Sequence, residues 1–299
     1  MNLSILYRGP LSSCNYGCDY CPFAKHTETD EEHAADAAAL ERFACWVEGN
    51  GEHTISVLFT PWGEALVRRR YQRTLARLTQ LAHVQKIAIQ TNLSCRLDWV
   101  EECDKAKLGL WATYHPTQTS REAFLAKCAD ADRRGVRFSV GVVGMKEHAE
   151  DIDALRRELP PHIYLWINAY KRVPDYYTAE ELERFTAVDT LFPINNQRHP
   201  SLGKECRTGQ SVISVDGDGT IRRCHFIRTA IGNIYDQDWK ASLQERPCAN
   251  ETCGCHIGYV HMDSLKLYDV FGDGVLERVP SPATFKGKSQ GLPIVIGGI

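Results

Sequence analysis

Six short apolar segments recur between residues 2 and 170, and stretches with helical spacing separate them. The segment from Thr54 to Thr60 is apolar and β-branched, which is typical of a strand buried on both faces. Between residues 30 and 48, Leu40, Phe43 and Val47 recur at the spacing of one helix face. Strands that alternate with helices predict a parallel sheet covered by helices. We expect strands over 2–7, 54–60, 86–91, 108–115, 136–143 and 163–170, and helices over 30–48, 67–82, 97–103, 120–134, 147–159 and 178–188.

A doubly wound open sheet would show the same alternation of strands and helices. Such sheets often carry a glycine-rich phosphate-binding fingerprint in the first turn from strand to helix. The turn after residue 7 has no such fingerprint. The sequence therefore favours a partial barrel over an open doubly wound sheet.

The alternation stops near residue 190. The segments 211–215 and 220–224, joined by Asp216-Gly217-Asp218-Gly219, predict a β-hairpin. Five of the 12 cysteines lie between Cys206 and Cys255. We therefore expect two parts, residues 1–190 and residues 191–299, and the apolar tail after about residue 286 receives no assignment.

Three cysteines lie close together directly after the first expected strand. Cys14, Cys18 and Cys21 have the spacing C-x3-C-x2-C, and Gly17 between them allows a tight turn. A structural zinc site needs four ligands, and neither His26 nor His33 completes a paired knuckle. Three thiolates suit a [4Fe–4S] cluster that leaves one iron open for another ligand.

Charge and composition exclude some functions. The chain has 35 Lys and Arg against 38 Asp and Glu, a net charge of −3, which favours neither nucleic acid nor an anionic membrane as a partner. It has no apolar run of membrane-spanning length and no export signal at residues 1–10. Twelve cysteines in such a chain are expected to be reduced and to bind metal. We expect a cytoplasmic protein.

The three-cysteine run, with the aromatic Tyr20 before its last thiol, resembles the signature loop of the radical S-adenosylmethionine (SAM) enzymes. The resemblance implies a (β/α)6 partial TIM barrel, a SAM-binding [4Fe–4S] cluster on Cys14, Cys18 and Cys21, and a Tyr20 ring packed against adenine.

A second stretch carries the same resemblance. Thr60-Pro61-Trp62-Gly63-Glu64-Ala65 follows the second strand, where radical SAM enzymes commonly have Gly-Gly-Glu-Pro. Gly63 and Glu64 match, while Trp62 and Ala65 depart from the pattern. The resemblance implies that Glu64 accepts a hydrogen bond from the SAM ammonium, although an ordinary turn with a surface Glu would look similar. Thr91 and Asn92, after the third strand, resemble a Thr-Asn pair of the family.

Polar residues also follow the fourth and sixth strands. The carboxyl ends of parallel barrel strands are where ligands bind, which makes His115 and Asn168 candidate catalytic residues. His115 would exchange a proton near the substrate, or be a structural histidine. Asn168 lies in an apolar run, so its burial requires a hydrogen bond to SAM, to substrate or within the core.

The second cysteine group begins with Cys206-x12-Gly219-x4-Cys224, which resembles the opening of the auxiliary-cluster domains known as SPASM and twitch. The resemblance implies a second [4Fe–4S] cluster, and a zinc ribbon is the alternative. The expected ligands are Cys206, Cys224, Cys253 and Cys255, with Cys248 as the spare, although a pairing of Cys248 with Cys255 would also close the site. Cys45, Cys95, Cys103 and Cys128 are scattered and are expected to be small buried residues rather than ligands.

The resemblance implies an oxidoreductase. Flavodoxin or ferredoxin would reduce the first cluster, SAM would be cleaved to a 5′-deoxyadenosyl radical, and this radical would take hydrogen from a substrate. Oxidation of a small molecule is the first hypothesis. Modification of a ribosomal peptide is the second, and the 13 residues before Cys14 make an N-terminal peptide-recognition domain unexpected. A zinc scaffold and an RNA-modifying enzyme are weaker alternatives.

Overall fold

One curved sheet of nine strands organises the protein. The computed structural model describes residues 1–23 and 26–282. The strands of the sheet are β1 (Asn2–Arg8), β2 (Thr54–Phe59), β3 (Val84–Thr91), β4 (Leu108–Tyr114), β5 (Arg137–Gly144), β6 (Leu165–Ala169), β8 (Val212–Asp216), β9 (Thr220–Arg222) and β10 (Ala230–Asn233). Their order in space is β10-β9-β8-β1-β2-β3-β4-β5-β6. The pairs from β1 to β6 are all parallel, so the fold is a mixed α/β fold with a mostly parallel sheet.

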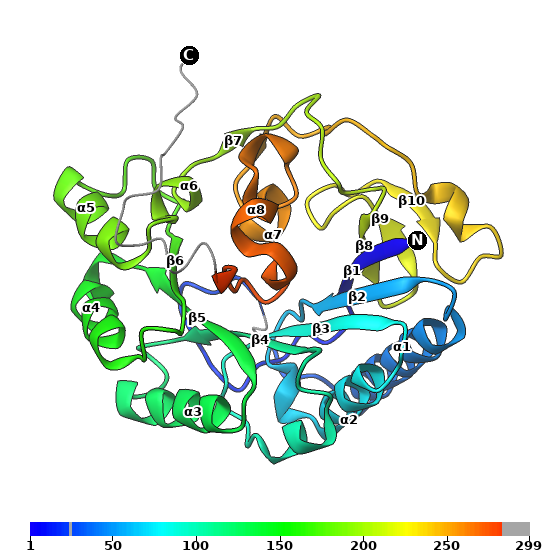
Figure 1. Ribbon diagram of the computed structural model, residues 1–299, viewed down its shortest axis with the longest axis horizontal. Helices are drawn as coiled ribbons and strands as arrows, with labels where there is room; N and C mark the ends of the chain where they lie inside the picture. Colours follow the sequence, from blue (N-terminus) through cyan, green and yellow to red (C-terminus); the bar gives the residue numbers. More distant parts are fainter. Residues whose placement is uncertain (24–25, 283–299) are drawn as a thin grey trace.

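Helices cover the sheet on both sides. They are α1 (Asp30–Gly49), α2 (Arg69–Thr79), α3 (Arg121–Arg133), α4 (Ala149–Glu158), α5 (Ala179–Val188), α6 (Phe192–Asn195), α7 (His256–Tyr259) and α8 (Leu267–Phe271). Figure 1 shows α1 to α5 around the outside of the curve and α7 and α8 inside its hollow. No helix of residues 1–23 and 26–282 is long and apolar enough to cross a membrane.

The two sides of the sheet belong to two apolar cores. Successive residues of a strand point to opposite faces. Ile5 and Tyr7 of β1 pack in the core with the outer helices, whereas Leu6 packs in the inner core with α7 and α8. Trp111 of β4 and Trp166 of β6 also face inward. Burial on both faces explains why these strands read as continuous apolar runs.

The expected helices begin where their caps indicate. Thr29 and Thr178 form capping boxes before α1 and α5, and the Ser120 hydroxyl accepts a hydrogen bond from Ala123 N before α3. The segment 97–103 was expected to be a helix and is instead a 3₁₀ helix over Asp98–Glu102, in which Val100 N donates to the Leu97 carbonyl and Cys103 N to the Val100 carbonyl, both at i to i−3 spacing. Val67, expected on the buried face of the second helix, precedes α2 and is exposed.

The expected β-hairpin is confirmed, since β8 and β9 pair antiparallel. The sequence did not predict that β8 also pairs in parallel with β1 and so extends the main sheet. The hairpin is thus continuous with the strands that precede residue 190. The division into 1–190 and 191–299 stays a prediction, and the tail after residue 286 lies outside the described residues.

The segment after α8 closes the amino-terminal end of the strands. Glu277 forms ion pairs with Lys86 at the start of β3 and with Arg137 at the start of β5, each at 3.1 Å. Its backbone carbonyl accepts a hydrogen bond from Ser139 Oγ at 2.7 Å. The opposite, carboxyl-terminal end of the strands carries the expected site residues.

Candidate active site

The three thiols after β1 line one pocket. Cys14, Cys18 and Cys21 form no disulfide bond, and the Cys21 amide donates to the Cys18 carbonyl at 3.1 Å to close the turn between them. Tyr16 N donates to Cys14 Sγ at 3.4 Å. Burial raises the pKa of Cys14 and Cys18. Their thiolate forms therefore need a compensating cation, as iron would provide.

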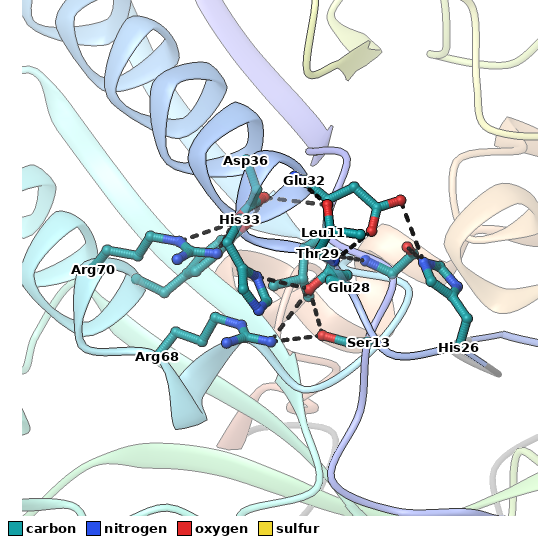
Figure 2. A network of polar contacts seen from close by, with 12 residues as sticks. Leu11, Ser13, His26, Glu28, Thr29, Glu32, His33, Asp36, Arg68 and Arg70 are labelled. Atoms are coloured by element: carbon teal, nitrogen blue, oxygen red, sulfur yellow. Dashed lines mark hydrogen bonds and ion pairs between the residues drawn. The ribbon is translucent and has the colours of Figure 1, made fainter.

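Glu28 ties the start of this loop to the residue before α2, as Figure 2 shows. Its carboxylate accepts hydrogen bonds from Ser12 N at 2.8 Å and Ser13 Oγ at 2.5 Å, and Arg68 donates to it at 3.2 Å. Burial acts to raise the pKa of Glu28, but these donors outweigh it and hold the pKa below its ordinary value. The ionised carboxylate thus fixes the backbone directly before Cys14.

Asp36 of α1 makes a second anchor on the same loop (Figure 2). Its carboxylate is fully buried and accepts hydrogen bonds from Leu11 N at 3.2 Å and Tyr71 Oη at 2.8 Å. Arg70 of α2 pairs with the other oxygen at 2.6 Å. The two carboxylates together join the thiol loop to α1 and α2.

Gly63 lies against the thiol loop with no room for a side chain. A Cβ at this position would lie 1.8 Å from the Ser13 carbonyl oxygen. The adjacent Glu64 N donates to the same carbonyl at 3.2 Å. The match at Gly63 is therefore explained by close approach of two backbones. The departure at Trp62 places an exposed indole at the pocket, stacked on Phe23 with ring centroids 5.5 Å apart.

Glu64 is buried in the pocket wall, not on the surface. Its carboxylate accepts hydrogen bonds from Thr91 Oγ1 at 2.8 Å, from Asn92 N and from Leu66 N at 3.0 Å. Burial raises the pKa of Glu64 to about 7 in spite of these donors. Thr91 and Asn92 thus orient Glu64, and Asn92 Nδ2 also donates to Asn15 Oδ1 at 3.0 Å within the thiol loop.

His115 and Tyr20 meet at the pocket. Tyr20 Oη lies 2.7 Å from His115 Nδ1, and Cys18 Sγ lies 3.4 Å from the same nitrogen. Burial lowers the pKa of His115 to about 4, so the imidazole is neutral at physiological pH. Its Nδ1 can then accept a hydrogen bond from the Tyr20 hydroxyl. Tyr20 therefore braces His115, and its expected contact with adenine stays a prediction.

The expectation that Asn168 is buried was wrong. Its side chain is exposed and lines the pocket together with Trp111 and Trp166. β6 is an edge strand of the sheet, so an apolar run there does not bury every residue. The Asn168 amide can therefore contact a ligand in the pocket, and no free energy is lost by burying it without a hydrogen-bond partner.

The second cysteine group separates into two places. Burial and the nearby Cys206 and Cys248 raise the pKa of Cys224 to about 11, and burial and the nearby Cys224 and Cys255 raise that of Cys253 to about 12. Hydrogen bonds between Gly203 N and the Cys248 carbonyl (2.8 Å) and between Cys248 N and the Lys204 carbonyl (3.2 Å) bring Cys248 toward Cys206. Cys255 instead lines the pocket of the first three thiols.

The thiols of Cys14, Cys18 and Cys21 surround one pocket. In the parts of the chain that the structure describes, no three Cys, His, Asp or Glu side chains are arranged to hold one metal ion. A four-iron cluster presents a separate iron to each thiolate, so its ligands surround a cavity rather than converge on one point. Cys14, Cys18 and Cys21 around one pocket fit that requirement.

Solved structures share this fold. Native anSMEcpe with bound AdoMet (SAM) matches with a TM-score of 0.55 and 16% identity over 81% of this chain and 80% of that chain. Native anSMEcpe with bound AdoMet and Cp18Cys peptide matches with a TM-score of 0.52 and 18% identity over 81% and 80%. This chain shares the fold of these structures. At these identities the likeness concerns the fold alone.

A weaker likeness joins the chain to BtrN in complex with AdoMet and 2-DOIA. It has a TM-score of 0.36 and 14% identity over 82% of this chain and 83% of that chain, and no argument rests on it. No family model and no curated protein matches the sequence.

Several residues of this site were missed by sequence reasoning. Glu28 and Asp36 anchor the thiol loop, and Arg278 lines the pocket. Each of these residues lies in a segment without a recognisable motif. The sequence therefore showed only that they are charged, not which groups they contact. Their roles depend on contacts with residues far away along the chain.

Proposed function

We propose that this protein is a radical SAM oxidoreductase whose Cys14, Cys18 and Cys21 hold a [4Fe–4S] cluster. The observation that carries the proposal is the convergence of three thiols and the buried Glu64 on one pocket at the carboxyl end of a parallel sheet. Such a cluster, when bound, supplies one electron to SAM and so yields a 5′-deoxyadenosyl radical that abstracts hydrogen.

The chain's own residues bind and orient SAM. Ionised Glu64 accepts a hydrogen bond from the SAM ammonium, and Thr91 and Asn92 hold the carboxylate in place. Gly63 lets this loop lie against the thiol loop. The stacked Trp62 and Phe23 at the pocket limit the access of water.

Substrate meets His115 and Asn168 on the pocket wall. With a pKa of about 4, His115 takes part as a neutral hydrogen-bond partner, and Tyr20 keeps its Nδ1 occupied. Asn168 offers an amide donor and acceptor. Both residues therefore orient the carbon–hydrogen bond rather than carry charge.

We further propose an auxiliary [4Fe–4S] cluster on Cys206, Cys224, Cys248 and Cys253. The support is that the nearby Cys206 and Cys248 help raise the pKa of Cys224 and that the nearby Cys224 helps raise that of Cys253. Cys255 also acts on the pKa of Cys253, but it lines the first pocket. This set replaces Cys255 with Cys248 relative to the expectation from the sequence. Four ligands leave no open iron, which suits an electron carrier.

Oxidation of a small molecule, in the cytoplasm and with flavodoxin or ferredoxin as reductant, is the first candidate reaction. Modification of a peptide is the second, because anSMEcpe was solved with a bound peptide. Transfer of deuterium from labelled peptides or labelled small molecules into 5′-deoxyadenosine would distinguish the two.

The test of the proposal is SAM cleavage by anaerobically reconstituted protein. With dithionite, it should bind about eight irons and form 5′-deoxyadenosine slowly without substrate. Cys18→Ala should abolish the product, while Cys45→Ala, at an exposed thiol of α1, should not. Stoichiometric zinc without charge-transfer absorbance would refute the proposal.

A further inference from the structure

Arg278 is a buried cation at the pocket of the thiol loop. It lines that pocket, yet only 1% of its surface is exposed. Its Nε has no hydrogen-bond partner, and no ion pair joins the guanidinium to any residue of 1–23 and 26–282. The guanidinium lies 4.4 Å from the ring centroid of Trp166 and 5.8 Å from that of Trp111.

The carboxylates of Glu277 and Asp189 interact with groups other than the Arg278 guanidinium. Glu277 pairs with Lys86 and Arg137. Asp189 accepts hydrogen bonds from Tyr164 Oη at 2.6 Å, from Ile167 N at 3.0 Å and from Leu191 N at 3.0 Å. A buried charge without a counter-ion is costly, and contact with two indole rings offsets only part of that cost.

The backbone holds Arg278 in an unfavourable conformation. Its φ is +56°, in the left-handed region that non-glycine residues rarely adopt. The preceding carbonyl is held by Ser139 Oγ, which itself accepts a hydrogen bond from Trp166 Nε1 at 3.1 Å. Strain of this kind persists where the surroundings over-determine it, and it concentrates at ligand sites. The guanidinium is thus rigidly placed before any ligand arrives.

Further donors face the same region. Lys171 Nζ donates to the carbonyl of Asn195 and, at 2.6 Å, to that of Gly254, beside Cys255. His256 lines the pocket, and its Nε2 is buried without a partner. In this part of the wall Arg278 therefore supplies positive charge and His256 a buried nitrogen without a partner, while Trp111 and Trp166 supply apolar surface.

We propose that Arg278 binds an anionic group, a carboxylate or a phosphate, on the substrate, with Trp111 and Trp166 packing against the adjoining apolar or aromatic part. The planar guanidinium matches both anions with two parallel hydrogen bonds. The inference rests on the proposed function, since it names the substrate class of the same pocket.

The test measures the preference for anions over a neutral analogue. Benzoate, phenyl phosphate and benzamide are titrated into reconstituted protein with SAM, and binding is followed by tryptophan fluorescence. Wild-type protein should bind at least one of the two anions about tenfold or more tightly than benzamide. Arg278→Met should lose this preference, and Arg96→Met, at an exposed arginine, should keep it. Benzoate and phenyl phosphate together tell carboxylate from phosphate recognition.

Two further measurements keep the outcomes separable. Arg278→Met should melt no lower than wild type, because it removes an unpaired buried charge. If that variant does not fold, Arg278→Lys should weaken anion binding about tenfold with no change for benzamide. Equal loss for anions and benzamide, no preference in wild type, or a preference that survives in Arg278→Met would overturn the inference.

SAM affinity and slow 5′-deoxyadenosine formation are measured in wild type and in Arg278→Met alongside the anion titrations. A selective loss of SAM affinity would assign the guanidinium to SAM and overturn the inference. If wild-type protein cleaves no SAM, the proposed function is refuted. The fluorescence titrations would still show whether the protein prefers anions to benzamide.

Discussion

The Thr91 hydroxyl donates a hydrogen bond to Glu64 Oε1 at 2.8 Å and so joins the end of β3 to the loop after β2. The Asn92 and Leu66 amides donate to the same carboxylate. Three donors would ordinarily lower the pKa of a carboxyl group, but burial raises that of Glu64 to about 7. A nearby cation would shift the carboxyl group to its ionised form at neutral pH.

Glu64→Ala should weaken SAM binding by about 1.5–3 kcal/mol, because a charge-assisted hydrogen bond to the ammonium is lost. Isothermal titration of reconstituted protein measures this difference. An unchanged affinity would show that the match to the family at Gly63 and Glu64 is accidental.

The same carboxyl group predicts a dependence on pH. SAM binding requires ionised Glu64, so the dissociation constant should rise about tenfold per unit as pH falls below about 7. Protein stability without SAM should change in the opposite sense. The pKa of Glu64 in the folded protein is raised from 4.5 to about 7. Its stabilising contribution to the free energy of unfolding is therefore fully present below pH 4.5 and is lost as pH rises to about 7. Glu64→Gln should remove both slopes, and a wild-type slope in that variant would contradict the assignment.

Gly63→Ala should distort the thiol loop. The new Cβ would overlap the Ser13 carbonyl oxygen, and backbone movement should cost about 1–3 kcal/mol or more. We expect a lower melting temperature and reduced iron content. Gly49→Ala is the control, because no atom lies within 4 Å of its added Cβ. Equal behaviour of the two variants would mean that the loops do not touch.

Asp36→Asn should destabilise the protein by about 3–5 kcal/mol, because Arg70 and the Leu11 amide would lose a buried charged partner. Denaturant unfolding measures this change. Asp98→Asn removes an exposed carboxylate that pairs with Arg96 and Arg134, and should cost at most about 1 kcal/mol. A small effect at Asp36 would show that the thiol loop is held by other contacts.

Cys248→Ala and Cys255→Ala should differ in iron content. Cys248→Ala should lose about four of about eight irons, whereas Cys255→Ala should keep them all. Replacement of Cys14, Cys18 and Cys21 together should remove the other half. Iron and sulfide assays report these numbers, and full iron in Cys248→Ala would restore Cys255 as the fourth ligand.

The sequence determined the local elements of this protein. Apolar β-branched runs specify the six parallel strands, and Thr29, Ser120 and Thr178 specify where helices begin, because caps and periodicity act between residues close in the chain. The run from Cys14 to Cys21 was readable for the same reason, since all three ligands lie on one short loop.

Tertiary structure decided which distant groups meet. The pairing of β8 with β1, the anchoring of Ser13 by Glu28 and the entry of Arg278 into the pocket all join residues at least 15 positions apart. It also placed Cys255 at the first pocket although Cys253 is two residues away. Residues two apart in an extended chain point to the same face, so spacing alone would have grouped the two thiols. The chain leaves the strand β11 (Thr252–Cys253) and enters α7 at His256, and this change of conformation separates them.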